Sequence, residues 1–314
     1  MNQRFAMVGS GGYIAERHMR AIKDTGNDLV VALDKHDSVG IIDRYFPNSD
    51  FFIEFERFDR HIEKLKRQGN GVRYITICSP NYLHDSHIRF ALRAGADAIC
   101  EKPLVLNPWN VEALKESEKE FDHKVNTILQ LRLHPSLIEF KKKIESGPNK
   151  IYDVDLSYLT SRGNWYLISW KGQLEKSGGI ATNIGIHFFD MLSWIFGPVK
   201  KSTLHASNPT MSSGFLELEK ARVRWFLSID EKNLPKEVVA KGQRTYRSIT
   251  CDGEEIEFSG GFEDLHTASY RNILEGNGFG LDDAMSSIQT VYEIRNTNPI
   301  GKVGEYHPFL NNVN

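Results

Sequence analysis

The sequence predicts an α/β fold in two parts: an N-terminal doubly wound parallel sheet, and a C-terminal α+β part with an open, mainly antiparallel sheet. Three observations lead to this class. Strand and helix patterns alternate through residues 1–130, strand patterns dominate after Gly147-Pro148-Asn149, and 314 residues suit about two domains of ~150 residues each. We therefore expect domains at residues 1–130 and 131–314.

Five short apolar or β-branched runs predict the strands of the first sheet. They are residues 3–9, 29–34, 73–78, 97–101 and 124–129. Apolar residues at helical spacing predict helices at residues 12–24, 38–45, 59–68, 82–94, 108–121 and 135–146. Strands separated by helices run parallel through right-handed crossovers, so the sheet should be doubly wound.

The second part has more strands than helices. We expect strands at residues 150–159, 199–207, 212–219, 221–230, 246–251 and 254–258, and helices at 180–196, 264–274 and 281–296. The segment 221–229 alternates apolar and polar side chains, which suits an antiparallel sheet with one free face. Such a face is often used for subunit contact, so we expect a homo-oligomer.

Composition excludes several classes of protein. Apolar residues make up 40% of the chain and charged residues 25%, and 39 basic against 41 acidic residues give a net charge of −2, so nucleic acid and membrane surfaces are not expected partners. No apolar stretch approaches the ~18 residues of a membrane span, and the start of the chain lacks a signal-peptide pattern. Cys78, Cys100 and Cys251 lack ligand spacing and are odd in number, so we expect no metal site, no disulfide framework and a cytoplasmic protein.

A glycine-rich turn follows the first strand. The motif Gly9-Ser10-Gly11-Gly12-Tyr13-Ile14-Ala15 opens a helix, where free N–H groups and the helix dipole favour pyrophosphate. Asp34 ends the second strand, where a carboxylate can bind ribose hydroxyls and repel a 2′-phosphate. This context predicts a Rossmann domain that binds NAD, although Lys35 weakens the preference over NADP. The alternative is a tight turn in an unliganded domain.

Three later segments supply polar groups for an active site. Glu101-Lys102-Pro103 and Cys78-Ser79-Pro80-Asn81, with His84, follow neighbouring strands at the carboxyl edge of the sheet, where such folds bind ligands. In the segment Gly178–Asp190, Asn183 and His187 are four residues apart and share a helix face. Taken alone, Lys102 could be a surface residue, His84 part of a capped turn, and His187 a structural histidine.

These motifs, in this order, resemble the Gfo/Idh/MocA family, the glucose–fructose oxidoreductase and inositol dehydrogenase group. The resemblance covers nearly the whole chain. It implies that Lys102 and His187 lie beside the nicotinamide and the reacting carbinol, and that the bond before Pro103 is cis. Many members have an acidic residue where this chain has Asn183, which cannot take a proton. More of the base role then falls to Lys102, whose pKa a neighbouring positive nicotinamide could lower.

The segments GSGGYIAERHMRAIKDTGN, LQLRLHPS, SRGNWYLISWKG and GGIATNIGIHFFDML further resemble UDP-2-acetamido-2-deoxy-glucuronate 3-dehydrogenases. Asparagine at position 183 is familiar in that group. The resemblance implies NAD-dependent oxidation of the UDP-sugar acid to a 3-keto sugar for lipopolysaccharide (O-antigen) biosynthesis, and a tetramer. Some members of that group return the hydride to 2-oxoglutarate, so 2-oxoglutarate is a candidate partner here. The cofactor-binding residues we expect are Gly9, Gly11, Gly12, Tyr13, Ile14, Asp34, Lys35, Ser79, Asn81, His84, Glu101, Lys102, Gln130, Trp170 and Lys171.

Residue chemistry suits such a substrate. Arg132, Arg162 and Lys171 offer fixed cations for carboxylate and pyrophosphate, while Trp165, Tyr166 and Trp170 offer rings that can stack on a base or a sugar. The alternative for the aromatic segment is an ordinary packing loop. The substrate-binding residues we expect are Lys102, Arg132, Arg162, Trp165, Tyr166, Asn183 and His187, and the catalytic ones are Lys102, His187 and Asn183.

Three other functions stay open at this point. A dehydrogenase of an unactivated sugar or cyclitol in the same family would not bind uridine diphosphate tightly. A non-catalytic NAD-sensing regulator has no need of Lys102, Asn183 and His187 together. A structural or assembly protein that uses its open sheet would bind no dinucleotide.

Overall fold

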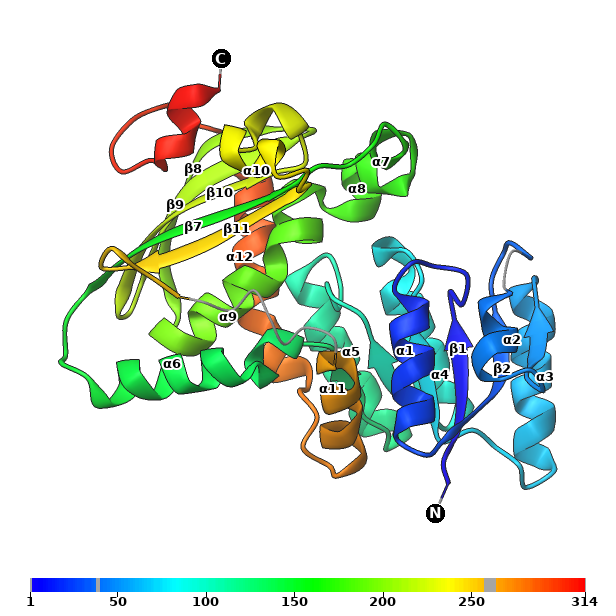
Figure 1. Cartoon of the computed structure of the whole chain (residues 1–314). Coiled ribbons are helices and arrows are strands. Elements are labelled where there is room, and N and C mark those ends of the chain that lie inside the picture. Colours follow the sequence, from blue (N-terminus) through cyan, green and yellow to red (C-terminus); the bar gives the residue numbers. More distant parts are fainter. Residues whose placement is uncertain (1, 38–39, 257–263, 314) are drawn as a thin grey trace. The chain divides into compact units, whose positions relative to one another are not determined.

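The structure is a computed structural model that describes residues 2–37, 40–256 and 264–313 (Figure 1). The chain divides into two compact units. The first unit comprises Met1–Gln130 and Glu263–Met285, and the second comprises Leu131–Phe262 and Ser286–Asn314. The boundary expected from the sequence left Glu263–Met285 with the C-terminal part, so the first unit draws on a second segment that comes much later in the chain.

The first unit contains a six-stranded sheet in which every neighbouring pair is parallel. The strand order is β3-β2-β1-β4-β5-β6, which confirms the doubly wound fold. The strands are β1 Arg4–Val8, β2 Asp28–Leu33, β3 Asp50–Phe52, β4 Tyr74–Ile77, β5 Asp97–Cys100 and β6 Val125–Thr127. The sequence did not predict β3, because three residues are too few to show a period.

The helices of this unit bury one stripe each against the sheet. In α1, Ala15, His18, Met19 and Ile22 recur at helical spacing and are all buried. This helix packs against α11, which belongs to the later segment. The helices are α1 Ala15–Asp24, α2 Ile41–Tyr45, α3 Phe55–Arg67, α4 His84–Ala94, α5 Pro108–Phe121 and α11 Leu265–Leu274.

The second unit contains a mixed sheet with the order β12-β11-β7-β10-β9-β8. Only the β10–β7 pair is parallel among the pairs of this sheet that the structure describes, so the mainly antiparallel sheet is confirmed. The strands are β7 Tyr152–Thr160, β8 Val199–Asn208, β9 Met211–Leu218, β10 Ala221–Ser228, β11 Thr245–Cys251 and β12 Glu254–Glu255. Residues 257 and 258 of the strand expected at 254–258 lie outside the described residues.

Both faces of this sheet are covered along part of β10. Trp225 packs edge-on against Phe189 of α9, at a ring separation of 5.2 Å. On the other face, Phe226 contacts His307 and Phe309 near the C-terminus. The remaining helices are α6 Pro135–Ser146, α7 Trp165–Ile168, α8 Leu174–Ser177, α9 Ile186–Phe196, α10 Lys236–Ala240 and α12 Leu281–Asn296, of which α12 spans the division between the units.

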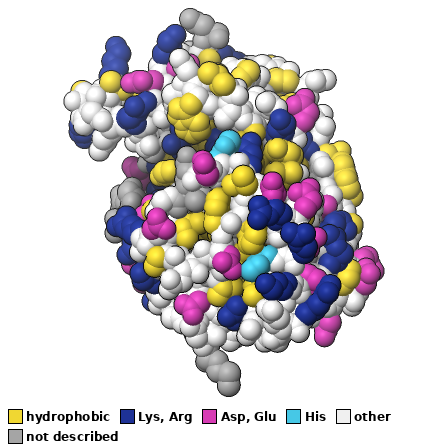
Figure 2. Space-filling model, turned by 90° about the vertical axis from the view of Figure 1, so that its right-hand side faces the viewer, with side chains coloured by type: hydrophobic (Ala, Val, Ile, Leu, Met, Phe, Trp, Pro, Cys, Tyr) yellow, Lys and Arg dark blue, Asp and Glu magenta, His cyan; other side chains and the backbone are white. Residues whose placement is uncertain are grey.

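The surface carries charges of both signs. On the face shown in Figure 2, lysine and arginine side chains are interspersed with aspartate and glutamate. Among the helices that the structure describes, none is both long and apolar enough to cross a membrane. Cys78, Cys100 and Cys251 are free and buried. Burial raises the pKa of all three thiols, for Cys251 to about 11, so they stay protonated at neutral pH.

Candidate active site

The turn after β1 has a backbone that only glycine can supply. Gly9 has a φ of 86°, in the left-handed region. A Cβ atom there would lie 2.6 Å from the backbone C of Cys78 and from the backbone N of Ser79. The N–H groups of Gly9 and Ser10 both donate to the Leu33 carbonyl, at 2.8 and 3.2 Å. The ends of β1, β2 and β4 therefore meet around one glycine.

Asp34 lies directly beside this turn. Its Oδ2 accepts the Gly11 N–H at 2.8 Å and its Oδ1 accepts the His36 N–H at 3.0 Å. Lys35 and Tyr13 are exposed, and Ile14 precedes α1 as its N-cap. A glycine cradle next to a carboxylate at the end of β2 fits the pyrophosphate and adenosine ribose of a dinucleotide.

Two buried histidines organise the loop after β4. The Ser79 hydroxyl bonds His87 Nδ1 at 2.8 Å, and burial lowers the pKa of His87 to about 4. His84 lies between two carbonyl oxygens, with Nδ1 2.7 Å from Pro103 O and Nε2 2.8 Å from Ser79 O. Burial lowers the pKa of His84 as well, and its neutral ring has one N–H, which donates to one of these two carbonyl oxygens. Asn81, also buried, begins the next turn at Asn81–Leu83.

Lys102 follows β5 at the same edge of the sheet. The bond between Lys102 and Pro103 is cis, as the family resemblance implied. The Lys102 N–H donates to Oε2 of Glu101 at 3.1 Å. Lys102 is half-buried and Glu101 is buried.

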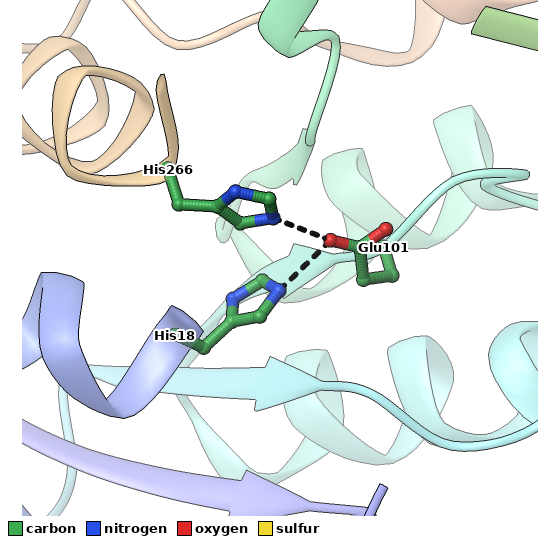
Figure 3. Close-up of side chains that lie close together, drawn as sticks. All are labelled: His18, Glu101 and His266. Carbon is green, nitrogen blue, oxygen red and sulfur yellow. Dashed lines mark hydrogen bonds and ion pairs between the residues drawn. The ribbon is translucent and has the colours of Figure 1, made fainter. Parts of the chain in front are cut away.

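Glu101 is the centre of a buried network that the sequence did not reveal (Figure 3). Its Oε1 lies 2.9 Å from Nε2 of His18 on α1 and 2.9 Å from Nε2 of His266 on α11. Burial by itself raises the pKa of the Glu101 carboxyl, but the hydrogen bonds from the two histidines outweigh burial and hold this pKa well below its ordinary value. The carboxylate is therefore ionised and fully hydrogen-bonded.

The same three side chains also meet the spacing of metal ligands. Within the part of the chain that the structure describes, His18, Glu101 and His266 are the only such trio, with ligand atoms within 4.8 Å of one another. Each short contact is nevertheless an N–H donor facing a carboxylate oxygen. Hydrogen bonding accounts for the arrangement without a metal ion.

In the second unit, Asn183 and His187 lie next to each other along one helical stretch. Asn183 belongs to a π-helical turn, Ala181–Gly185, that leads into α9, and such turns are frequent at functional sites. Its Nδ2 donates to the Tyr166 hydroxyl at 2.6 Å. Burial raises the pKa of Tyr166, so the hydroxyl stays protonated. Asn183 and His187 are both half-buried, and the His187 ring packs against Phe188 at 4.5 Å.

Arg132 has a carboxylate partner within its own unit. Its Nε and Nη2 donate to the two oxygens of Asp190 at 3.0 and 2.7 Å, and both side chains are almost fully buried. This bidentate pair joins the turn Gln130–Leu133 to α9, one turn beyond His187. Gln130 carries a buried Oε1 that has no partner among the described residues. That oxygen could accept a hydrogen bond from a ligand.

Arg162 lines a cavity of about 670 Å³ in the second unit. The cavity is also lined by Asn164, Asp230, Lys232 and Lys236. Its volume falls within the usual ~300–1,000 Å³ of ligand pockets. The wall residues Asn164 and Leu167 flank Tyr166, whose hydroxyl contacts Asn183.

The aromatic segment places its rings around a lysine. Lys171 Nζ lies 4.2 Å from the Trp170 ring centre and 5.7 Å from that of Trp165. Trp165 is 54% exposed, so its face is accessible for stacking. Of the expected catalytic residues, Lys102 lies in the first unit, and Asn183 and His187 in the second. The latter two lie on one continuous helical stretch.

Comparison with known proteins shows the family. Residues 3–128 match the profile of the Gfo/Idh/MocA oxidoreductase family, NAD-binding Rossmann fold, and residues 141–228 match its C-terminal alpha/beta domain. A WlbA (WbpB) dehydrogenase from Thermus thermophilus, solved with NAD and alpha-ketoglutarate, is 51% identical with a TM-score of 0.95, over 98% of this chain and 100% of that one. A second structure of that dehydrogenase, with NAD and UDP-GlcNAcA, is 50% identical with a TM-score of 0.94 over the same shares.

A curated relative is more distant. Inositol 2-dehydrogenase of Rhizobium meliloti is 29% identical over 198 residues, which is 63% of this chain. The chain spans 56% of that relative's own length, less than two thirds.

Proposed function

Because this chain belongs to the Gfo/Idh/MocA oxidoreductase family, we propose that it is an NAD-dependent dehydrogenase of a UDP-sugar acid. The reaction is oxidation of the 3-hydroxyl of UDP-2-acetamido-2-deoxy-D-glucuronate to the ketone. One observation carries the proposal: the Thermus dehydrogenase that is 50% identical over nearly the whole chain is solved with NAD and UDP-GlcNAcA. The glycine cradle and Asp34 in this chain fit the cofactor of that complex.

NAD, when bound, accepts the hydride from C3 of the sugar. The chain's own groups hold the cofactor and move the proton. In this proposal the turn formed by Gly9, Gly11 and Gly12 receives the pyrophosphate on its backbone N–H groups, and Asp34 accepts hydrogen bonds from the ribose. The Ser79 backbone lies directly beside Gly9 of this cradle.

Lys102 and His187 are our candidates for the base that takes the proton of the 3-hydroxyl. Asn183, fixed by Tyr166, can hydrogen-bond the sugar but cannot accept a proton itself. Lys102 is the stronger candidate, because Asn183 is neutral and gives a protonated His187 no counter-charge. In this proposal, Arg162 and the cavity that it lines receive the diphosphate side of the substrate.

The wider setting is part of the same proposal. We place the enzyme in the cytoplasm, in synthesis of the diamino sugars of bacterial surface polysaccharide, with 2-oxoglutarate as the compound that takes the hydride back. The complex of the Thermus dehydrogenase with alpha-ketoglutarate supports that acceptor. We further propose a tetramer that uses the face of the second sheet on which Arg222 and Arg224 pair with Glu305 and Asp155.

The test is mass spectrometry of the protein mixed with UDP-2-acetamido-2-deoxy-D-glucuronate and 2-oxoglutarate. A sugar lighter by two hydrogens, formed together with 2-hydroxyglutarate, supports both parts of the proposal. Oxidised sugar that forms only with added NAD keeps the dehydrogenase and contradicts the recycling. No oxidation under either condition contradicts the proposed substrate, and the inositol dehydrogenase relative then favours an unactivated sugar or cyclitol.

The base is tested by Lys102→Ala. Loss of a general base lowers the rate by roughly 10²–10⁴-fold. We expect single-turnover formation of NADH to slow by that factor while NAD still binds. Lys119→Ala is the control, because Lys119 is an exposed lysine that pairs only with Glu116 among the described contacts. A normal rate of hydride transfer in Lys102→Ala would exclude Lys102 as the base.

A further inference from the structure

We propose that Glu101, held between His18 and His266, is a positioning residue that fixes the backbone at Lys102 for proton transfer. The proposal rests on the role of Lys102 given above. Figure 3 shows the two imidazole rings converging from α1 and α11 on one oxygen of the carboxylate. The other oxygen accepts the Lys102 N–H.

The protons of this network have one consistent arrangement. An ionised carboxylate only accepts, so both histidines donate through Nε2. Burial lowers the pKa of His18, which is therefore neutral, and its Nδ1 must accept. The donor is the Tyr270 hydroxyl at 2.9 Å, and this hydroxyl in turn accepts from Thr76 Oγ1 at 2.8 Å. A one-way chain of donors runs from Thr76 to Glu101.

This series of hydrogen bonds fixes the Glu101 carboxylate, which accepts the Lys102 N–H. Every member of it is buried, and the members come from α1, β4, α11 and the end of β5. On the far side of Lys102, Nδ1 of His84 lies 2.7 Å from the carbonyl oxygen of Pro103. Buried polar groups therefore lie against the main chain both before and after Lys102, whose own side chain is half-buried.

Stability alone does not explain such a network. Replacing a buried ionic group by well-packed apolar side chains of the same volume is often neutral or stabilising. A buried carboxylate with two histidines is instead suited to setting a position. A misplacement of 1 Å at a reacting group can lower a rate by about 100-fold. A network that fixes the position of Lys102 therefore maintains the rate of proton transfer.

The decisive variant is Glu101→Gln. Its amide oxygen can still accept from both histidines, but its NH2 group would face the Lys102 N–H, donor to donor. The matched control is Asp97→Asn at the opposite end of β5. Asp97 is also a buried carboxylate, and it accepts the Lys124 N–H and a bond from His123, both at 3.0 Å. We expect kcat to fall about 100-fold in Glu101→Gln with little change in KM, and kcat to stay unchanged in Asp97→Asn.

A second pair of variants separates positioning from folding. His266→Gln retains an N–H donor for Glu101, and His266→Leu does not. We expect the Gln variant to keep kcat within about threefold of the native enzyme and the Leu variant to lose it. Equal kcat values in two folded His266 variants, or in Glu101→Gln and Asp97→Asn, would overturn the proposal.

Hydrogen exchange at the Lys102 amide provides a readout that needs no sugar. We expect slow exchange in the native chain and faster exchange in Glu101→Gln, because the acceptor is lost. Equal exchange in both proteins would overturn the positioning of Lys102. A native chain that protects this amide but oxidises no UDP-sugar would instead contradict the proposed function.

Discussion

The carboxylate of Asp34 serves both the turn and the proposed cofactor. It accepts the N–H groups of Gly11 and His36, and its negative charge would repel the 2′-phosphate of NADP. Asp34→Asn keeps an oxygen for the turn and removes the charge. We expect the ratio of kcat/KM for NAD to that for NADP to fall by about tenfold or more, which is ~1.4 kcal/mol.

Steady-state kinetics with both cofactors measure that ratio. Asp37→Asn is the control, since Asp37 is exposed and lies three residues further along the chain. An unchanged ratio in Asp34→Asn would mean that another group selects NAD.

The Tyr166 hydroxyl is the acceptor for the amide of Asn183, at 2.6 Å. Tyr166→Phe removes this acceptor of the Asn183 Nδ2 hydrogen bond. A hydrogen bond of this kind contributes about 1 kcal/mol, so we expect kcat/KM for the sugar to fall about fivefold. Tyr246→Phe on β11, whose ring packs against Phe309, is the control. Equal kinetics in the two variants would remove Asn183 from the set that Tyr166 orients.

At the scale of elements, the turn between β1 and α1 depends on Gly9 in two ways. Gly9→Ala combines a positive φ with a Cβ 2.6 Å from two backbone atoms of Cys78 and Ser79. Gly26→Ala has a similar φ of 73° but meets nothing within 4 Å. We expect Gly26→Ala to lower the free energy of unfolding by about 1–3 kcal/mol and to bind NAD normally.

Gly9→Ala should lower the free energy of unfolding by more than Gly26→Ala does, and it should also abolish NAD binding. Urea unfolding and calorimetric titration with NAD measure the two effects. Gly40→Ala, where φ is −52° and the space is open, should be close to neutral. Native NAD affinity in Gly9→Ala would show that the turn is not the cradle.

The elements that could be predicted from the sequence are those whose apolar residues follow a regular pattern. Buried parallel strands such as β4 are continuous apolar runs, and helices such as α1 show a stripe of buried residues. The π-helical turn at Asn183 could not be predicted, since no single-residue pattern marks a change from the α-helical spacing. The helix expected at 180–196 therefore begins with that turn.

Site residues close in sequence could be proposed, and those joined only by the fold could not. Lys102 and His187 stood out by motif. His18 and His266 lie 83 and 165 residues from Glu101 along the chain, so nothing local connects them to it. For the same reason Arg132, 58 residues from Asp190, was expected to face the substrate without the partner that the fold gives it.

For the whole molecule, buried histidines predict a loss of stability in weak acid. Burial lowers the pKa of His87 and of His307 to about 4, from about 6.5 in an unfolded chain. Between pH 6.5 and 4 the unfolded chain therefore takes up protons that the folded chain does not. The free energy of unfolding is therefore highest above pH 6.5. It falls as the pH decreases through this range, by up to about 3 kcal/mol for each histidine.

The variant His307→Asn tests this expectation. Nδ1 of His307 accepts the Phe309 N–H at 3.1 Å, and an asparagine oxygen can take that place without titrating. We expect a shallower dependence of the unfolding free energy on pH, measured with urea at several values from neutral to weakly acidic. An unaltered slope would assign the loss of stability to other groups.

The division of the chain into units has a consequence for its synthesis. The first unit needs α11, whose Tyr270 and Ile273 are part of its core, and α11 is encoded after the larger segment of the second unit, Leu131–Phe262. At ~5–20 residues per second, a ribosome finishes Gln130 roughly 7–30 s before it finishes α11. During that interval Glu101 lacks His266, and the side of the nascent sheet that α11 later covers is left bare. The chain therefore cannot mature strictly from its first residue to its last, and a gene cut after Gln130 should yield a protein that depends on chaperones.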